Sequence, residues 1–205
     1  MSWSAAVEDN KSAIESPTGE PGRAEYPMPD VTGHFRYGGS RGHAFVSAFV
    51  GKGRFRPTQG KPDSVTLWGF DLSGRLKTYG RDYAYTQFTF GEGVGRYRGG
   101  VTAVPDANGE LQPVGVVAWM LGYEHYWSDR LSTNAVYSVA SSADEDYYRA
   151  DFNKDLDYGA INLIYWFLPK RAWAGVEYLY GRREVFDGGD GSAHRVHFAV
   201  RFNFP

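Results

Sequence analysis

The chain has 205 residues, enough for one sizeable domain, and its 22 Lys and Arg nearly balance its 24 Asp and Glu. A net charge of -2 provides no long-range field for attracting nucleic acid, and the lack of cysteine excludes disulfides and thiolate sites. No run of about 18 apolar residues is present, which excludes transmembrane helices, and the N-terminal MSWSAAVEDN does not have a signal-peptide pattern. If the protein is exported, we expect the signal to lie outside this chain.

Apolar and polar residues alternate along most of the chain, in segments bounded by Gly, Pro, Asp and Asn. This period of two predicts an all-β fold. The expected strands lie near residues 2–9, 30–37, 43–55, 64–77, 82–92, 114–127, 131–142, 156–167, 171–183 and 193–204.

The connections between these strands alternate in length. Those at 38–42, 78–81, 128–130 and 168–171 are short, whereas those around 10–29, 55–63, 93–113, 142–155 and 185–192 are long. Antiparallel outer-membrane barrels have short turns at one end and long loops at the other, with strands of about 10 residues. The sequence therefore predicts an antiparallel transmembrane β-barrel.

The two faces of the predicted strands differ in polarity. Segment 64–77, for example, alternates an apolar series of Trp68, Phe70, Leu72 and Leu76 with a polar series of Asp71, Ser73, Arg75 and Lys77. A soluble β-sandwich gives the same alternation. Two further features favour a membrane barrel: aromatic residues cluster near strand ends at 123–127, 165–167 and 178–180, and the final strand ends on Phe204.

The segments VAWMLGYEHYWSDRLSTNAVYSVA, INLIYWFLPKRAWAGVEYLYGRREVFDGGDG and AHRVHFAVRFNF resemble the closing strands of the DcaP-like trimeric porins. The resemblance covers Val114 to Phe204 well and the first strand more loosely. It implies a passive channel, a homotrimer and small anionic, dicarboxylate-like solutes. Members of that family are roughly twice as long, so we expect residues 1–205 to be one β-barrel domain, the C-terminal portion of a longer porin. Its ten strands either close on themselves or pair with strands elsewhere, and we favour the second arrangement.

Seven residues of the inward-facing series are candidates for lining a pore with positive charge. Arginine and lysine rings favour anions in a pore. The candidates are Arg36, Arg75, Lys77, Arg195 and Arg201, with His34 and His197. The alternative is a generally polar lumen in which inward Asp71, Glu124 and Glu177 pair with these cations across strands.

The long segment after residue 92 carries Arg96 and Arg98 on either side of Tyr97. It is either a constriction loop folded into the lumen or a mobile outer loop. Its GEGVGRYRGG stretch lacks the following amphipathic helix that phosphate binding would need. In the acidic run at 143–155, Asp144, Glu145, Asp146 and Asp151 could hold a divalent cation, although a solvated loop is the favoured interpretation.

The leading hypothesis is a passive channel of the outer membrane, in contact with lipid and without a cofactor or a nucleic-acid partner. We expect no enzymatic activity, because the five histidines have no serine or carboxylate motif beside them. The alternative hypothesis is a soluble or periplasmic lipocalin-like barrel, whose apolar residues would face an enclosed ligand cavity.

Overall fold

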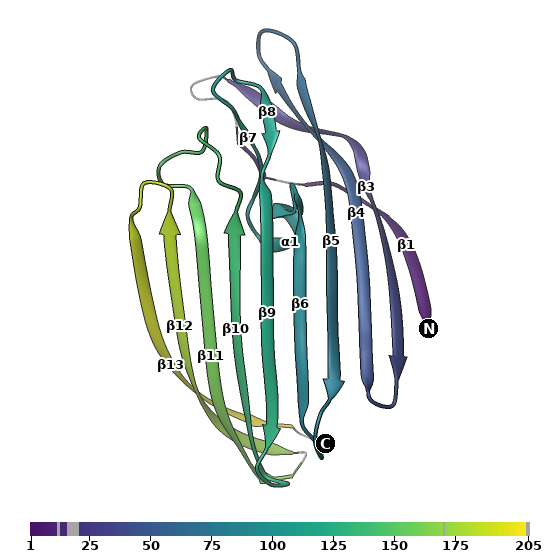
Figure 1. Cartoon of the computed structure of the whole chain (residues 1–205), viewed down its shortest axis with the longest axis vertical. Helices are drawn as coiled ribbons and strands as arrows, with labels where there is room; N and C mark the ends of the chain where they lie inside the picture. Colours follow the sequence, from purple (N-terminus) through teal and green to yellow (C-terminus); the bar gives the residue numbers. More distant parts are fainter. Residues whose placement is uncertain (12, 16–20, 170, 204–205) are drawn as a thin grey trace.

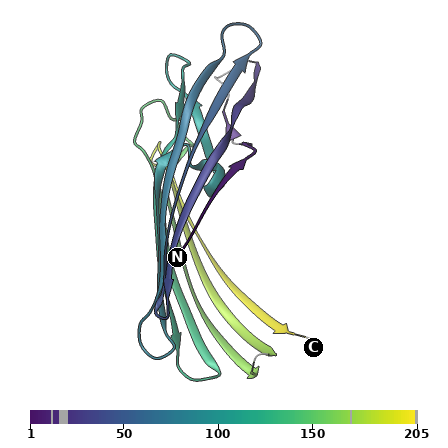
Figure 2. The same cartoon turned by 90° about the vertical axis from the view of Figure 1, so that its right-hand side faces the viewer.

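A computed structural model of the chain describes residues 1–11, 13–15, 21–169 and 171–203. It contains one large antiparallel sheet, curved into a trough (Figures 1 and 2). The ten strands, in spatial order, are β1 (Ser2–Glu8), β3 (Gly22–Gly39), β4 (Gly42–Pro57), β5 (Asp63–Lys77), β6 (Tyr83–Glu92), β9 (Gly115–Tyr126), β10 (Leu131–Ser142), β11 (Asn153–Leu168), β12 (Ala172–Val185) and β13 (Asp190–Phe202). The predicted all-β class and antiparallel pairing are confirmed. The terminal aromatic Phe204 lies outside the described residues.

The largest departure from the expected strand bounds is in β3, which begins at Gly22, inside the segment expected to be a loop. Pro27 and Pro29 interrupt the alternation there, because proline cannot donate to a strand ladder. The structure accommodates them through register shifts between Glu25 and Val31. Proline is typical of such irregular positions in strands.

The short turns all lie at one end of the sheet, named here the turn end, which is at the bottom of Figure 1. The other connections lie at the opposite, loop end, which agrees with the expected topology. Those at 58–62 and 186–189 are as short as the turns, however, because the strands beside them extend into the segments expected to be long loops. Among the described residues, no helix is long and apolar enough to cross a membrane.

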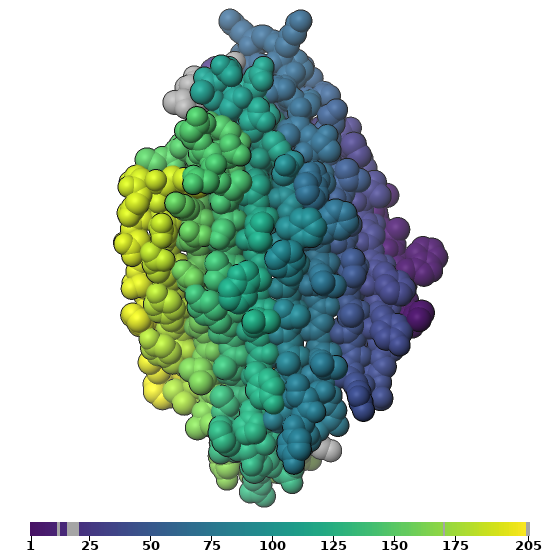
Figure 3. Space-filling model, viewed as in Figure 1, coloured from purple at the N-terminus to yellow at the C-terminus, as the bar shows by residue number. Residues whose placement is uncertain are grey.

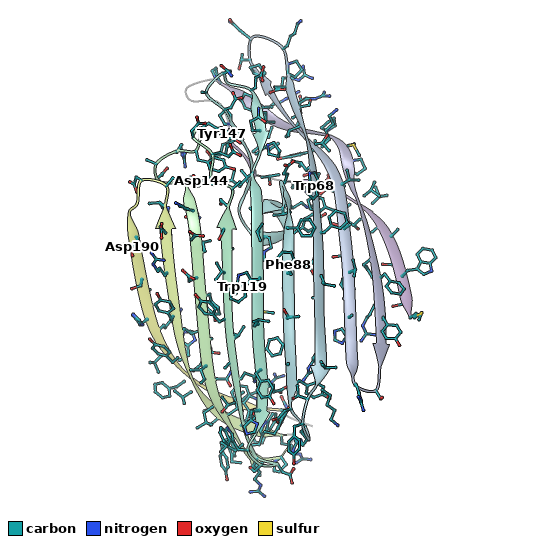
Figure 4. The ribbon with its side chains drawn as sticks, in the orientation of Figure 1. Trp68, Phe88, Trp119, Asp144, Tyr147 and Asp190 are labelled. Carbon is teal, nitrogen blue, oxygen red and sulfur yellow. The ribbon has the colours of Figure 1, made fainter. Side chains whose placement is uncertain are left out.

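The convex face of the sheet is apolar and exposed, and Figure 3 shows this face. Leu72 is 53% exposed and Phe198 is 82% exposed, although both belong to regular strands. Trp68, Phe88 and Trp119 are spread across the same face in Figure 4. An apolar outer face with polar residues on the inner face is the side-chain distribution of an outer-membrane barrel.

Amphipathic aromatic side chains mark the two limits of this apolar band. Towards the loop end, the Trp68 indole donates to Glu92 over 3.0 Å. At the turn end, the Trp127 indole donates to the Thr133 hydroxyl over 2.9 Å. Tryptophan and tyrosine favour membrane interfaces because one end of the ring is apolar and the other is polar.

A second, three-stranded sheet forms at the loop end from β2 (Ala13–Ile14), β7 (Val101–Pro105) and β8 (Leu111–Pro113). The helical turn α1 (Gly95–Arg98) comes directly before β7 in the chain. Neighbouring residues of β7 contribute to separate clusters. Ala103 packs with Phe55, Val65, Leu67 and Leu111, whereas Val104 packs with Val114, Tyr148 and Phe152. β7 is therefore packed on both sides, because its alternate side chains are buried in different clusters.

The sheet is open in the described part of the chain. β1 and β13 are its two edge strands, and no register joins them. Their outer backbone N–H and C=O groups are therefore not paired with each other.

Candidate functional site on the inner wall

The candidate pore-lining residues lie on the concave face, where they alternate with the exposed apolar residues of the convex face. They do not form one cluster. The candidates on the N-terminal strands are His34 and Arg36 on β3, and Arg75 and Lys77 on β5. Those on the edge strand β13 are Arg195, His197 and Arg201.

A polar row crosses the inner face from β5 to β13. Its members are successive cross-strand partners, so their side chains share one face of the sheet. They are Lys77, Tyr83, Glu124, Asn134, Asn162, Glu177 and His197. The row includes two of the candidates from opposite sides of the trough and gives the inner wall a continuous series of hydrogen-bonding groups.

The inward carboxylates are matched by nearby donors. Glu124 pairs with Arg75, whose guanidinium also stacks 3.8 Å from the centre of the Tyr83 ring. Asp71 accepts hydrogen bonds of 2.6 Å from both Gln87 and Thr89. The expected pairing of an inward acid with a candidate cation is therefore present at Glu124, whereas the partners of Asp71 are neutral.

Glu177 has a weaker match in His197, whose Nδ1 lies 3.9 Å from Glu177 Oε2. Arg201 donates to the Asn203 side chain over 3.0 Å. By contrast, Arg36, Lys77 and Arg195 have no carboxylate partner among the described residues. These three cations face the trough with their charge not neutralised by the described wall.

Helical turn α1 lies against the inner wall near the loop end (Figures 1 and 2). Arg96 pairs with Asp30 over 2.5 Å and with Glu8 over 3.3 Å, and the Tyr97 hydroxyl lies 3.2 Å from Asp30. The ring of Tyr97 packs 4.7 Å from that of Phe49. These contacts hold the segment on the side of the trough formed by β1, β3 and β4.

Asp30 is the centre of this attachment and was not among the sequence candidates. It is 1% exposed and also accepts a 2.7 Å hydrogen bond from the buried Asn10 amide. A side chain on Gly51 would overlap the Asp30 carboxylate, so glycine is needed on the facing strand. In the sequence, nothing marks Asp30 as an ion-pair partner except its position after a proline. Its partner Arg96 is 66 residues away.

Cavities lie on both sides of α1, and Arg98 lines both. One of about 350 Å³ includes His34, Ser47 and Gln87, and another of about 380 Å³ includes Lys154. Within the described residues, the hydrogen bond of the Arg98 side chain is a long one of 3.5 Å to the Thr89 hydroxyl. Lys154 was not among the sequence candidates. It lies near the end of the acidic run, outside the expected strand, so the alternation did not show that its side chain points inward.

The acidic run lies at the loop end, where Figure 4 labels Asp144 and Tyr147. Asp151 lies 3.2 Å from Arg149. In the part of the chain that the structure describes, no three His, Cys, Asp or Glu side chains are grouped so as to hold a metal ion.

At the turn end, Asp82 joins two strands through a set of hydrogen bonds. It accepts from the Tyr126 amide over 2.9 Å, from the Tyr123 hydroxyl over 3.1 Å, and contacts His125 Nδ1 at 2.6 Å. The Tyr126 amide, followed by His125, lowers the pKa of Asp82 below its usual value, because both stabilise the carboxylate form.

Comparison with solved structures identifies the fold. The chain superimposes on the crystal structure of the outer membrane channel DcaP of Acinetobacter baumannii with a TM-score of 0.83 and 24% identity, over 98% of this chain and 57% of that one. The chain has the fold of a DcaP-like outer-membrane porin. It therefore spans a little over half the length of the channel it resembles.

A second similar structure is the NanC porin, with a TM-score of 0.48 and 14% identity over 89% of this chain and 97% of that one. The sequence matches no protein-family model and no curated protein. The assignment of the fold rests on the DcaP superposition.

Proposed function

We propose that the chain forms part of the wall of an outer-membrane channel that admits small hydrophilic solutes by passive diffusion, with a preference for anionic, dicarboxylate-like ones. The apolar convex face and polar concave face support a lipid-exposed barrel with an aqueous lumen. A lipocalin-like module would need the opposite distribution, with apolar residues facing the enclosed side. The proposal involves no covalent chemistry.

We propose further that residues 1–205 are the C-terminal portion of a longer porin, whose other strands complete the wall. The open edges at β1 and β13 support this, since an unpaired strand edge in lipid leaves backbone groups without partners. The 57% coverage of the DcaP chain agrees with it. A homotrimer is proposed from the same resemblance, and cross-linking of the protein in outer membranes would test it.

The observation that carries the anion preference is the imbalance of charge pairing on the inner wall. Its carboxylates at Asp30 and Glu124 are paired with arginines, whereas Asp71 accepts only from neutral donors and Glu177 has only the long contact with His197. Arg36, Lys77 and Arg195 have no carboxylate partner among the described residues. An excess of unpaired cations lowers the energy of an anion in the lumen relative to a cation.

The test is single-channel recording of the full-length protein in planar bilayers under a KCl gradient. We expect the reversal potential of the wild type to have the sign that chloride permeation gives. In the variant with Arg36, Lys77 and Arg195 all replaced by Gln, the reversal potential should shift towards zero. Lys61→Gln, in an exposed connection at the loop end, is the matched control and should leave the potential unchanged. A cation-selective wild-type channel would contradict the proposed preference.

The proposed location has a separate test, which is fractionation of cells that express the full-length protein. We expect the protein to sediment with outer membranes and to require detergent for extraction. Recovery in the soluble fraction would support the lipocalin-like alternative instead.

A further inference from the structure

The apolar convex face contains a depression near the turn end, with a volume of about 1040 Å³. Its floor is formed by small outward residues on neighbouring strands, Ala44 on β4, Gly74 on β5 and Ala84 on β6. Tyr37 stands on one side and Leu121 on the other. The depression therefore interrupts a face that elsewhere carries large side chains such as Leu72 and Phe88.

The backbone enforces the shape of this floor. Gly42 has φ +145°, and a Cβ there would overlap the Arg75 carbonyl. A Cβ on Gly74 would lie 3.0 Å from the carbonyl oxygen of His43, tighter than ordinary contact. Close approach of β4 and β5 thus keeps large side chains out, and packing within the chain does not fill the space.

The floor contains little that would bind water. Thr86 contributes the hydroxyl among the outward floor residues, and it donates to the Met120 carbonyl over 2.9 Å. With that donor satisfied, the exposed surface of the depression is almost entirely apolar. An apolar hollow in the lipid-facing band must be filled by hydrocarbon or by another protein surface.

The lower rim of the depression is cationic. It is formed by Ser40 and Arg41 in the turn between β3 and β4, at the turn end of Figure 1. Arg41 is exposed and has no carboxylate partner among the described residues, and the nearby turn-end acids Asp82 and Asp129 are engaged by His125 and Arg81. A guanidinium beside a hydroxyl matches the charge and geometry of a phosphate diester.

We propose that this depression is a binding site for one glycerophospholipid, with its phosphate at Arg41 and Ser40 and an acyl chain over Ala44, Gly74 and Ala84. The inference rests on the proposed membrane location, because only a lipid-exposed face would meet such a ligand. The cation at the rim favours a lipid over a second copy of this chain, since an unpaired arginine beside an apolar floor complements one anionic head and one hydrocarbon tail. Tyr37, 56% exposed at the wall, would lie at the boundary between the two.

Native mass spectrometry of the full-length protein, delipidated in detergent and titrated with dioleoyl phosphatidylglycerol, tests the site. We expect one saturable lipid adduct on the wild type. Arg41→Gln should weaken it by about tenfold through loss of a charge-assisted hydrogen bond. Arg130→Gln, in another turn at the same end, is the matched control and should bind as the wild type does.

A second variant fills the floor without changing charge. Ala44→Leu combined with Ala84→Leu should abolish the adduct, whereas Ala174→Leu, on the outward face of β12, should not. Equal binding by wild type, Arg41→Gln and the filled variant would overturn the proposal. The proposal would also be overturned if the wild type showed no lipid adduct and the filled variant turned a trimer into monomers. That result would identify the depression as a subunit contact.

Circular dichroism and heat-modifiable gel mobility show whether the filled variant folds. If it does not fold, lipid binding by Arg41→Gln, a substitution in an exposed turn, tests the proposal by itself. Single-channel conductance of the same preparations separates the two proposals. A protein that conducts but retains no lipid contradicts only the lipid site, whereas a protein that does not enter outer membranes contradicts the channel.

Discussion

The two ends of the inner wall differ in how the trough is occupied. At the loop end, α1 and the small sheet are packed onto the wall, with Leu67 at 1% exposure and a buried Asp30 paired with a partly buried Arg96. At the turn end, the polar row and Arg75 are open to the trough. Substitutions at the loop end should therefore change stability and pore width together, whereas those at the turn end should change ion selectivity at little cost in stability.

Asp30→Asn should give the largest effect. The change keeps the shape of the side chain but leaves Arg96 without its nearest counter-charge, and removal of one partner from a buried ion pair costs about 4 kcal/mol. We expect a lower free energy of unfolding in urea, and larger, noisier single-channel currents as α1 detaches.

The matched control for that experiment is Asp71→Asn, because Asp71 is also inward but accepts only from neutral donors. Asp71→Asn should lower the free energy of unfolding by less than Asp30→Asn does, and it should leave the noise of the single-channel current unchanged. If the two variants behave alike, the ion pair does not hold the loop. A double-mutant cycle with Arg96→Gln would measure the coupling directly.

Leu67→Ala should cost about 3 kcal/mol, because the side chain is buried in the cluster with Phe55, Ala103 and Leu111 and its loss leaves a cavity. Leu163→Ala, on the lipid-facing side of β11, is the matched control and should cost less. The measurement is urea unfolding in the same detergent. Equal losses would mean that the loop end is no better packed than the lipid face.

Arg75→Met at the turn end should change stability by no more than about 1 kcal/mol, since the pair with Glu124 is partly exposed. Its effect should appear in the lumen, where Glu124 is left as an unpaired carboxylate. The reversal potential in a KCl gradient should move towards cation permeation, and Arg75→Met combined with Glu124→Gln should restore it. An unchanged potential in the single variant would show that this part of the wall lies outside the ion path.

Asp82→Asn should have the smallest effect, and that effect should depend on pH. Because the folded state lowers the pKa of Asp82, its stabilising contribution is present above the unfolded value of about 4 and is lost as pH falls through the folded pKa. The difference in unfolding free energy between wild type and variant should thus be full at pH 7 and disappear in acid. A pH-independent difference would point to lost packing instead.

The sequence determined the ten strands of the large sheet, the end at which its tight turns lie, and the face to which most of its side chains belong. These properties are local, because a period of two fixes the direction of the side chains along every regular stretch of strand. Residues such as Phe198 and Arg195 were therefore assigned to opposite faces without any knowledge of their neighbours.

Tertiary structure alone decided which charges are neutralised and which space is left empty. Asp30 meets Arg96 across 66 residues, Arg75 meets Glu124 across 49, and the depression at Ala44, Gly74 and Ala84 exists only because the register aligns small residues on adjacent strands. The period of the side chains specifies a face, but the pairing register and the path of the long loops specify the neighbours, and ion pairing and packing depend on neighbours.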